Sequence, residues 1–345
     1  MEAFYSRKRV LVTGGCSFIG SHLAESLLQD GAYVSIVDDL SSGLLENISS
    51  IKGSLEFIQG DLRDSSVADK ALNGKEIVFH LANIHGGRGF IETHPGEISQ
   101  NLLIDGNTFY ASLRNDVERV CYTSSACAYP TNLQTADKST QARYLSEEMA
   151  DPFVIGAAFA DGEYGWAKLM GEMALKGYYK QYGQKGVSCR LFTVYGPREN
   201  ESHAIIALIA KAIAAQDPYE IWGSGKQDRN FTFVDDIVEG LKRATARIDD
   251  CRAINIGTDE ITTIFDAAKL ACEIVGHEPA RFFFDKSKPE GVHARAADIS
   301  NQLKWLDWSP AIKFKDGLSK TIDWYRSSKS REEIIDAIAN KLFSR

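Results

Sequence analysis

Tyr164 and Lys168 are the two residues whose types and spacing point most directly to a reaction. They stand four positions apart in the segment YGWAK, so on a helix they share one face. A lysine ammonium beside a phenol favours the phenolate, and the phenolate can take the proton of a hydroxyl while a redox cofactor oxidises the carbon. Tyr–Lys pairs at this spacing are common by chance, so the interpretation depends on the elements that position them.

A glycine-rich turn, TGGCSFIG at residues 13–20, follows an expected strand and opens an expected helix. Glycine permits a tight turn and a close approach to a pyrophosphate, while the helix N-terminus offers free N–H donors. The next expected strand ends at Asp38, whose carboxylate can accept both adenosine ribose hydroxyls and would repel a 2′-phosphate. This favours NAD over NADP, with Asp61 near the adenine. The alternatives are a purely structural turn and two solvated strand ends. The predicted cofactor-binding residues are Gly14, Ser17, Phe18, Ile19, Gly20, Asp38, Asp61, Leu62, Leu81, Ala82, Tyr164 and Lys168.

Short apolar runs alternate with helical periodicity through the first half of the chain. This rhythm predicts an α/β fold, with a Rossmann-type doubly wound parallel sheet and a smaller C-terminal α/β substrate lobe. Strands are expected at residues 10–13, 33–37, 55–58, 77–80, 119–123, 187–192, 219–222 and 253–256, and helices at 19–29, 164–182, 204–215, 235–245 and 264–275.

Three regions are expected along the chain. Residues 1–195 form the NAD-binding domain, and residues 196–330 form mainly the substrate lobe, with the chain free to cross between the two. Residues 331–345 are expected to form a helical tail without a chemical role. The connection at 131–163 is long enough to cover a site.

Composition excludes several classes of protein. The 345 residues are 44% apolar and 25% charged, with a net charge of −8 and scattered basic residues, so we expect no nucleic-acid partner. The sequence has no run of about 18 apolar residues, so we expect no membrane span, and the N-terminus has no signal-peptide core. The six cysteines form no CxxC pair, and Cys and His do not cluster at ligand spacing. We therefore expect reduced thiols, a cytoplasmic location and no metal.

Nine motifs together resemble the extended short-chain dehydrogenase/reductase superfamily, in its nucleotide-sugar epimerase and dehydratase branch. The resemblance covers residues 9–325, and the motifs that carry it read TGGCSFIG, VDDLSSG, GDLRD, HLAN, SSACAYP, YGWAK, VYGP, WGSGKQDRNFTFVDD and INIG. HGGRGFI, SSACAYP and PEGVHARAADIS are most similar to GDP-mannose 3,5-epimerases. The resemblance implies that Ser125 and Tyr164 handle the hydroxyl, that Lys168 binds NAD ribose, and that Cys127 is a ring acid/base.

The chain also departs from that group. Ser17 replaces the middle glycine of the turn, and His203 stands where the 3,5-epimerases place a second acid/base lysine. Thr193 replaces a common asparagine, as in UDP-glucuronate 4-epimerases, and the connection from Cys127 to Tyr164 is longer than in either group. The alternatives are a small core side chain for Cys127 and a helix-start or surface histidine for His203.

An anionic ligand requires fixed donors, and Arg229 and Arg295 are the arginines expected at a diphosphate. Arg88 and Lys226 are weaker candidates, because either side chain is also typical of a solvated charge. The predicted substrate-binding residues are Gly87, Arg88, Ser125, Thr193, Arg229 and Arg295.

Three functional classes follow. The first is an NAD-dependent nucleotide-sugar epimerase with transient oxidation at carbon 4 and epimerisation at carbon 5, carbon 3 or both; its alternative is a UDP-sugar 4-epimerase acting on UDP-glucuronate or UDP-glucose. The second, a dehydratase, would need an Asp-Glu pair where Ala126 and Cys127 stand. The third, an NAD-sensing scaffold, would tend to lose the Tyr–Lys pair. The resemblance also implies a homodimer in which the Tyr164 helix and a helix near residues 98–113 pair with their copies.

Overall fold

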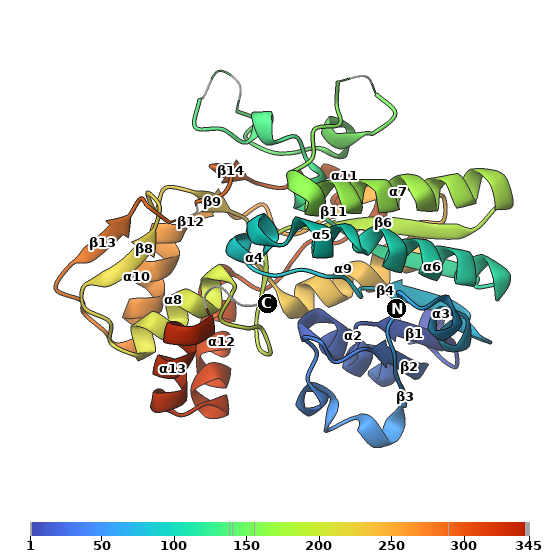
Figure 1. The fold of residues 1–345 in the computed structure, drawn as a ribbon, viewed down its shortest axis with the longest axis horizontal. Helices are drawn as coiled ribbons and strands as arrows, with labels where there is room; N and C mark the ends of the chain where they lie inside the picture. The colour runs from blue at the N-terminus through green and yellow to red at the C-terminus, as the bar shows by residue number, and fades with distance from the viewer. Residues whose placement is uncertain (1, 138, 140, 155, 289, 342–345) are drawn as a thin grey trace.

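Seven parallel strands form the central sheet, in the order β11-β6-β5-β4-β1-β2-β3. The computed structural model describes residues 2–137, 139, 141–154, 156–288 and 290–341. Strand β11 pairs with β6 at one edge and β3 pairs with β2 at the other (Figure 1). The strands are β1 (Arg9–Thr13), β2 (Tyr33–Asp38), β3 (Glu56–Gln59), β4 (Ile77–His80), β5 (Arg119–Ser125), β6 (Lys185–Leu191) and β11 (Ala253–Ile256).

The sheet is parallel because its strands are apolar on both faces. All four residues of β4 are buried, and so are the last four of β1. A strand of this kind needs helices on both sides, which βαβ crossovers supply. The predicted doubly wound α/β fold is confirmed.

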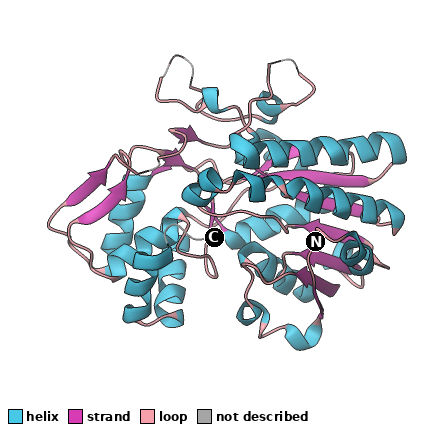
Figure 2. Ribbon diagram, viewed as in Figure 1, coloured by secondary structure: helices cyan, strands magenta, loops and turns pink. Residues whose placement is uncertain are grey.

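Helices cover both faces of the sheet (Figure 2). On one face α2 (Phe18–Gln29) packs beside α9 (Val234–Arg247), with Leu23 and Leu241 in a shared core. The other face carries α3 (Ser65–Leu72), α6 (Asn101–Arg114) and α7 (Gly162–Tyr182), which contribute to a second core.

The C-terminal lobe has its own apolar core. Helix α8 (Ala204–Ile213) packs against α10 (Ile264–Val275) and α13 (Arg331–Lys341). Residues 342–345 of the expected tail lie outside the described residues. The lobe also contains β8 (Tyr219–Trp222), β9 (Asp228–Arg229), β12 (Thr262–Thr263), β13 (Phe282–Asp285), β14 (Ala294–Arg295) and α12 (Phe314–Ser328).

The chain returns to the sheet after entering this lobe. Helix α9 and strand β11 follow residue 196 in sequence, yet they pack in the dinucleotide-type domain. The remaining elements are α1 (Glu2–Tyr5), α4 (Arg88–Thr93), α5 (Pro95–Ser99), α11 (Ser300–Leu306), β7 (Val194–Tyr195) and β10 (Thr232–Phe233). Among the residues that the structure describes, no helix is both long and apolar enough to cross a membrane.

The connection before α7 extends beyond the sheet in Figure 1. Buried Arg190 fixes one part of it, donating to the backbone carbonyls of Glu147 and Ala150 at 2.9 and 3.0 Å. The same guanidinium forms a 2.7 Å ion pair with Glu172 of α7. A single arginine therefore ties the connection to the helix that carries Tyr164.

Candidate active site

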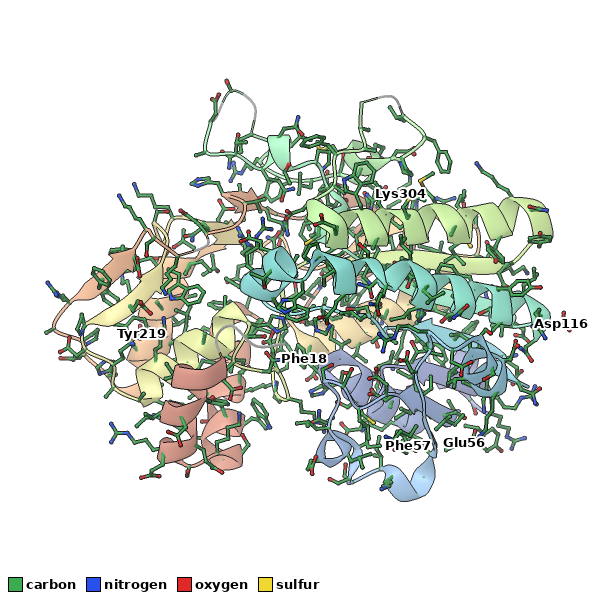
Figure 3. All side chains as sticks on the ribbon, in the orientation of Figure 1. Phe18, Glu56, Phe57, Asp116, Tyr219 and Lys304 are labelled. Carbon is green, nitrogen blue, oxygen red and sulfur yellow. The ribbon has the colours of Figure 1, made fainter. Side chains whose placement is uncertain are left out.

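A cleft of about 800 Å³ opens where the carboxyl ends of the strands face the C-terminal lobe. Phe18, labelled in Figure 3, lies at this junction, lines the cleft and packs against the core of the C-terminal lobe. Sixteen of the residues predicted for the site line it, namely Gly14, Ser17, Phe18, Ile19, Gly20, Asp38, Asp61, Leu62, Leu81, Ala82, Ser125, Cys127, Tyr164, Thr193, His203 and Arg295. Gly87, Arg88, Lys168, Lys226 and Arg229 are not among the lining residues.

The glycine-rich turn packs so closely against neighbouring backbone that Gly14 and Gly20 have no room for a side chain. Gly14 has φ of 67°, and a Cβ there would lie 3.1 Å from the backbone of Ala82. A Cβ on Gly20 would lie 2.2 Å from the Gly14 carbonyl oxygen. Ser17, by contrast, has φ of −85° and begins α2 as its N-cap. Because this backbone conformation suits any residue, the turn does not need glycine at position 17, and its geometry fits a pyrophosphate at the helix N-terminus.

Asp38 is a buried carboxylate at the end of β2. It accepts hydrogen bonds from the backbone N–H groups of Cys16 and Leu40, at 2.9 and 2.8 Å. These donors hold it where a ribose diol would lie in a fold of this type. Asp61 differs, because its carboxylate is engaged by Arg63 at 2.6 Å. Hydrogen bonds from Arg63 hold the pKa of Asp61 below its usual range.

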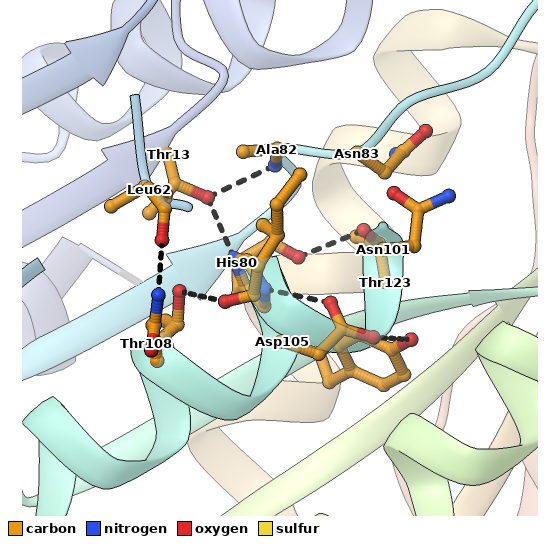
Figure 4. Close-up of polar contacts among 12 residues, drawn as sticks. Thr13, Leu62, His80, Ala82, Asn83, Asn101, Asp105, Thr108 and Thr123 are labelled. Atoms are coloured by element: carbon orange, nitrogen blue, oxygen red, sulfur yellow. Dashed lines mark hydrogen bonds and ion pairs between the residues drawn. The ribbon is translucent and has the colours of Figure 1, made fainter. Parts of the chain in front are cut away.

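A buried polar network below the cleft joins β1, β4 and α6 (Figure 4). Thr13 Oγ1 accepts from the N–H groups of Leu81 and Ala82 at 3.0 Å and lies 2.8 Å from His80 Nδ1. His80 Nε2 lies 3.0 Å from Asp105. The network fixes the backbone of Leu81 and Ala82, which lies against Gly14. His80 begins the HLAN motif, but no sequence pattern indicated a role for His80, Thr13 or Asp105.

Tyr164 and Lys168 lie in the first turns of α7, as predicted. Lys168 is buried, donates to the Thr123 carbonyl at 2.9 Å and lies 5.8 Å from the centre of the Tyr164 ring. Burial lowers the pKa of Lys168. Burial, with the charges of Cys127 and Asp105, raises the pKa of Tyr164 despite an opposing hydrogen bond with Ser125. The role of Lys168 in favouring the phenolate therefore stays a prediction.

Cys127 lies in a short 3₁₀ turn directly after β5. The other five cysteines are buried, but Cys127 is partly exposed and lines the cleft. The Arg295 guanidinium lies against it, with Nη1 3.2 Å from Sγ. A thiol beside a fixed cation is typical of reactive cysteines. Gly165 is necessary for this packing, since a Cβ there would lie 2.2 Å from the Cys127 carbonyl oxygen.

Arg295 is held by a polar cluster that no sequence pattern indicated. Its Nη2 donates to Asp161 at 2.8 Å and its Nε to Gln134 at 2.7 Å. Asp161 also accepts from Arg88 at 3.0 Å. Burial would raise the pKa of Asp161, but the two guanidiniums hold it below its usual range. Arg88 therefore contributes to the site through Asp161.

The other residues predicted to bind substrate have different surroundings. Arg229 pairs in register with Arg295 and donates to the Val292 carbonyl at 2.9 Å. Burial and the charge of Arg295 lower the pKa of Arg229 to about 10. A Cβ on Gly87 would lie 2.4 Å from the Ser202 carbonyl oxygen, which makes Gly87 a packing residue in this structure. Lys226 is exposed.

His203 is the N-cap residue of α8 and lines the cleft. Its Nδ1 lies 3.2 Å from Glu199 Oε1, and its ring stacks on that of His85 with centroids 5.9 Å apart. Burial raises the pKa of Glu199. The sequence indicated His203 but neither neighbour. His85 begins HGGRGFI, a stretch that carried the family resemblance without a role for the histidine, and the i, i+4 spacing of Glu199 and His203 was the missed signal.

Comparison with known proteins identifies the family to which the chain belongs. The model of the NAD dependent epimerase/dehydratase family matches residues 10–257. GDP-mannose 3,5-epimerase 1 from Oryza sativa subsp. japonica is 34% identical over 331 residues, which cover 94% of this chain and 83% of the rice protein.

Solved structures with the same fold include enzymes named for UDP-sugars rather than for GDP-mannose. UDP-glucuronic acid 4-epimerase from Bacillus cereus, in complex with UDP-glucuronic acid and NAD, has a TM-score of 0.82 at 27% identity, covering 93% of this chain and 100% of that chain. UDP-glucose 4-epimerase from Thermotoga maritima, with UDP-glucose, has a TM-score of 0.81 at 26% identity, covering 93% and 99%.

Proposed function

Because the chain belongs to the NAD dependent epimerase/dehydratase family, we propose that it is a nucleotide-sugar epimerase that oxidises carbon 4 transiently and inverts carbon 5, carbon 3 or both. The observation that carries this proposal is Cys127, with its sulfur 3.2 Å from Arg295, in the same cleft as Tyr164 and His203. The 34% identity to a GDP-mannose 3,5-epimerase supports the same reaction type.

The residues of α7 and β5 prepare the sugar hydroxyl. NAD, when bound, supplies the acceptor for the hydrogen of carbon 4 and returns it at the end of the cycle. Tyr164 takes the hydroxyl proton, and Ser125 holds that hydroxyl against Tyr164. Lys168, buried beneath the tyrosine, places a positive charge where a phenolate must form.

The ring inversion needs an acid and a base on opposite faces. A ketone at carbon 4 makes the hydrogens on carbons 3 and 5 acidic, because the carbanion is stabilised as an enolate. Cys127, whose sulfur lies 3.2 Å from Arg295, and His203, in the same cleft, are the two groups that we propose for these roles. One removes the ring proton and the other returns a proton to the opposite face, so the ring ends with the same number of hydrogens.

Solvent exchange tests this proposal. In deuterated water, inversion at carbon 5 or 3 must incorporate deuterium into the ring, and Cys127→Ser should slow incorporation by about 100-fold. Cys272→Ser, which changes a buried cysteine in the C-terminal lobe, is the matched control and should leave the rate unchanged. Turnover of GDP- and UDP-hexoses without ring deuterium would contradict the proposal.

A UDP-sugar 4-epimerase is the second candidate. Thr193 lines the cleft at the position where the chain resembles UDP-glucuronate 4-epimerases, and the TM-score of 0.82 to such an enzyme favours it. A 4-epimerase returns the same hydrogen to the other face of the ketone and needs neither Cys127 nor His203. Product inverted at carbon 4 without deuterium would establish this alternative. A dehydratase is less favoured, because Ala126 and Cys127 occupy the place of its Asp-Glu pair.

NAD is the cofactor, and we propose that it is held tightly. Gly14, Gly20 and Asp38 shape one end of the cleft, and the carboxylate at β2 disfavours a 2′-phosphate. We propose that the nucleotide-sugar occupies the other end, where Arg295 lines the cleft and would face its diphosphate; a role for Arg229, which pairs in register with Arg295 but does not line the cleft, stays a prediction. A cytoplasmic location stays a prediction.

We also propose a homodimer formed through α6 and α7. The two helices pack side by side and expose large apolar side chains, which are Leu102, Leu103, Tyr110, Trp166, Met170 and Tyr182. A four-helix contact with a second copy would bury them. A monomeric mass at micromolar concentration would overturn this assignment.

A further inference from the structure

The loop between β7 and α8, residues 196–203, is fixed by contacts at three places. Arg198 has φ of 71°, a conformation that a non-glycine residue keeps only when its surroundings impose it. Its guanidinium donates to Ser21 at 3.1 Å and to Glu25 at 2.8 Å, both on α2. Further along, Glu201 accepts from Tyr325 at 2.8 Å and pairs with Lys329.

The third fixed place is the contact of the loop with the turn before α4. The Ser202 carbonyl lies so close to Gly87 that a Cβ there would be 2.4 Å away. Side chains on this loop are therefore presented to the cleft in a defined position. Lys329, which directly follows α12, contributes to this through its ion pair with Glu201.

Within this loop, Glu199 is directed at His203. The Glu199 side chain is 4% exposed, and its Oε1 lies 3.2 Å from His203 Nδ1. Its Oε2 has no hydrogen-bond partner in the part of the chain that the structure describes. The Glu199–His203 contact is within ion-pair distance, although its angle falls short of a well-aligned hydrogen bond. Such contacts commonly tighten when a site is loaded.

We propose that Glu199 is a positioning residue for His203, accepting a hydrogen bond from Nδ1–H so that Nε2 is the nitrogen that exchanges protons with the sugar ring. This inference rests on the proposed function for the role of His203. A neutral imidazole has one N–H, and the partner of one nitrogen decides which tautomer forms. A carboxylate at Nδ1 leaves the Nε2 lone pair available as a base.

The proton balance is simple. When Nε2 removes a ring proton, His203 becomes an imidazolium with one proton on each nitrogen, and Glu199 neutralises its charge without itself taking a proton. When Nε2 gives the proton back, His203 returns to its starting tautomer. The His85 ring lies nearly parallel to that of His203, with centroids 5.9 Å apart, and so lies against one face of the imidazole.

Tautomer measurement tests the proposal without any substrate. Nitrogen NMR of the seven histidines, with His203→Asn to assign the signal, should show Nδ1–H in the wild-type protein. Glu199→Met removes the acceptor and should shift His203 toward Nε2–H, whereas Glu199→Gln keeps an acceptor and should retain Nδ1–H. Glu201→Met is the matched control, because this second buried carboxylate of the loop binds Tyr325 and Lys329 and not His203.

Kinetics provides the second measurement. Glu199→Met should lower kcat for ring deuterium incorporation by about 100-fold with little change in KM, while oxidation of carbon 4, followed by nicotinamide absorbance, stays near the wild-type rate. Glu201→Met should lower the melting temperature and leave the His203 tautomer unchanged. An unchanged tautomer in Glu199→Met, or an equal shift in Glu201→Met, would overturn the role of Glu199.

The two levels of the proposal fail separately. A tautomer that depends on Glu199, in a protein that never incorporates ring deuterium, would sustain the Glu199–His203 pair and reject the proposed epimerisation. Deuterium incorporation that is lost in Cys127→Ser but unaffected in Glu199→Met would sustain the proposed function and reject the positioning role.

Discussion

The two ends of the cleft are built by different means. At the cofactor end, the decisive features are backbone features, such as the turn at Gly14 and Gly20 and the N–H groups that hold Asp38. At the sugar end, the decisive features are contacts between charged and polar side chains, such as Arg295 with Cys127 and Asp161. Backbone shape tolerates little variation in sequence, whereas a polar cluster can change members and so change the substrate.

The two ends also differ in how far apart their residues stand in the sequence. Residues that shape the phosphate turn lie within 13–20, so local spacing reveals them. The sugar-end cluster joins residues at 88, 127, 134, 161 and 295, which the chain brings together only after it folds. A family resemblance therefore identifies the cofactor more readily than it identifies the sugar.

The largest expected effect belongs to the residue shared by both ends. Tyr164→Phe should lower turnover by at least about 100-fold, because it removes the group that takes the hydroxyl proton, while circular dichroism and melting temperature stay near wild type. Tyr33→Phe, an exposed tyrosine at the start of β2, is the control and should have no effect. Wild-type turnover in Tyr164→Phe would place the chemistry elsewhere in the cleft.

The sugar-end cluster should be the more vulnerable to loss of one charge. Asp161→Asn leaves Arg88 and Arg295 without their shared carboxylate and should lower the free energy of unfolding by about 2 kcal/mol at neutral pH, measured by urea titration. Glu92→Gln is the control, because Glu92 pairs with Arg88 at the surface and should contribute less than about 0.5 kcal/mol. An equal loss of unfolding free energy in Asp161→Asn and Glu92→Gln would contradict the greater importance of the buried carboxylate.

The stability difference between wild type and Asp161→Asn should depend on pH. The pKa of Asp161 is lower in the folded state, so its ion pairs stabilise the fold above the unfolded-state value of about 3.9. That contribution is lost as the pH falls from there through the folded-state pKa. The difference between wild type and Asp161→Asn should therefore be full at pH 6 and should shrink below about pH 4. A difference that grows in acid would contradict this sign.

The smallest expected effect lies at the cofactor end. Asp38→Ser should reduce the preference for NAD over NADP by about tenfold, measured as a ratio of dissociation constants, because it removes both the diol acceptor and the charge that repels a phosphate. Asp69→Ser is the control, because Asp69 lies on α3 outside the lining of the cleft and pairs with Arg114. Tighter binding of NADP than NAD by the wild-type protein would show that Asp38 does not select the cofactor.

The sequence by itself determined the elements whose signals are local. The strand at 77–80 and the helix at 264–275 have the boundaries that their apolar patterns predict, and the turn at 13–20 identifies the cofactor end. Period and turn chemistry act over a few residues, so they can be read before the chain folds. Cys127 and His203 were indicated by the alignment with the resembling family, and both line the cleft; their roles stay predictions.

Only the tertiary structure decided where distant segments meet. It placed β11 at the edge of the first domain's sheet, set Arg295 on Cys127, and brought Glu199 to His203 on a loop held from α2 and α12. The burial that raises the pKa of Tyr164 is likewise a property of the folded chain. Burial and long-range ion pairs depend on which surfaces the folded chain encloses, and no local spacing specifies them.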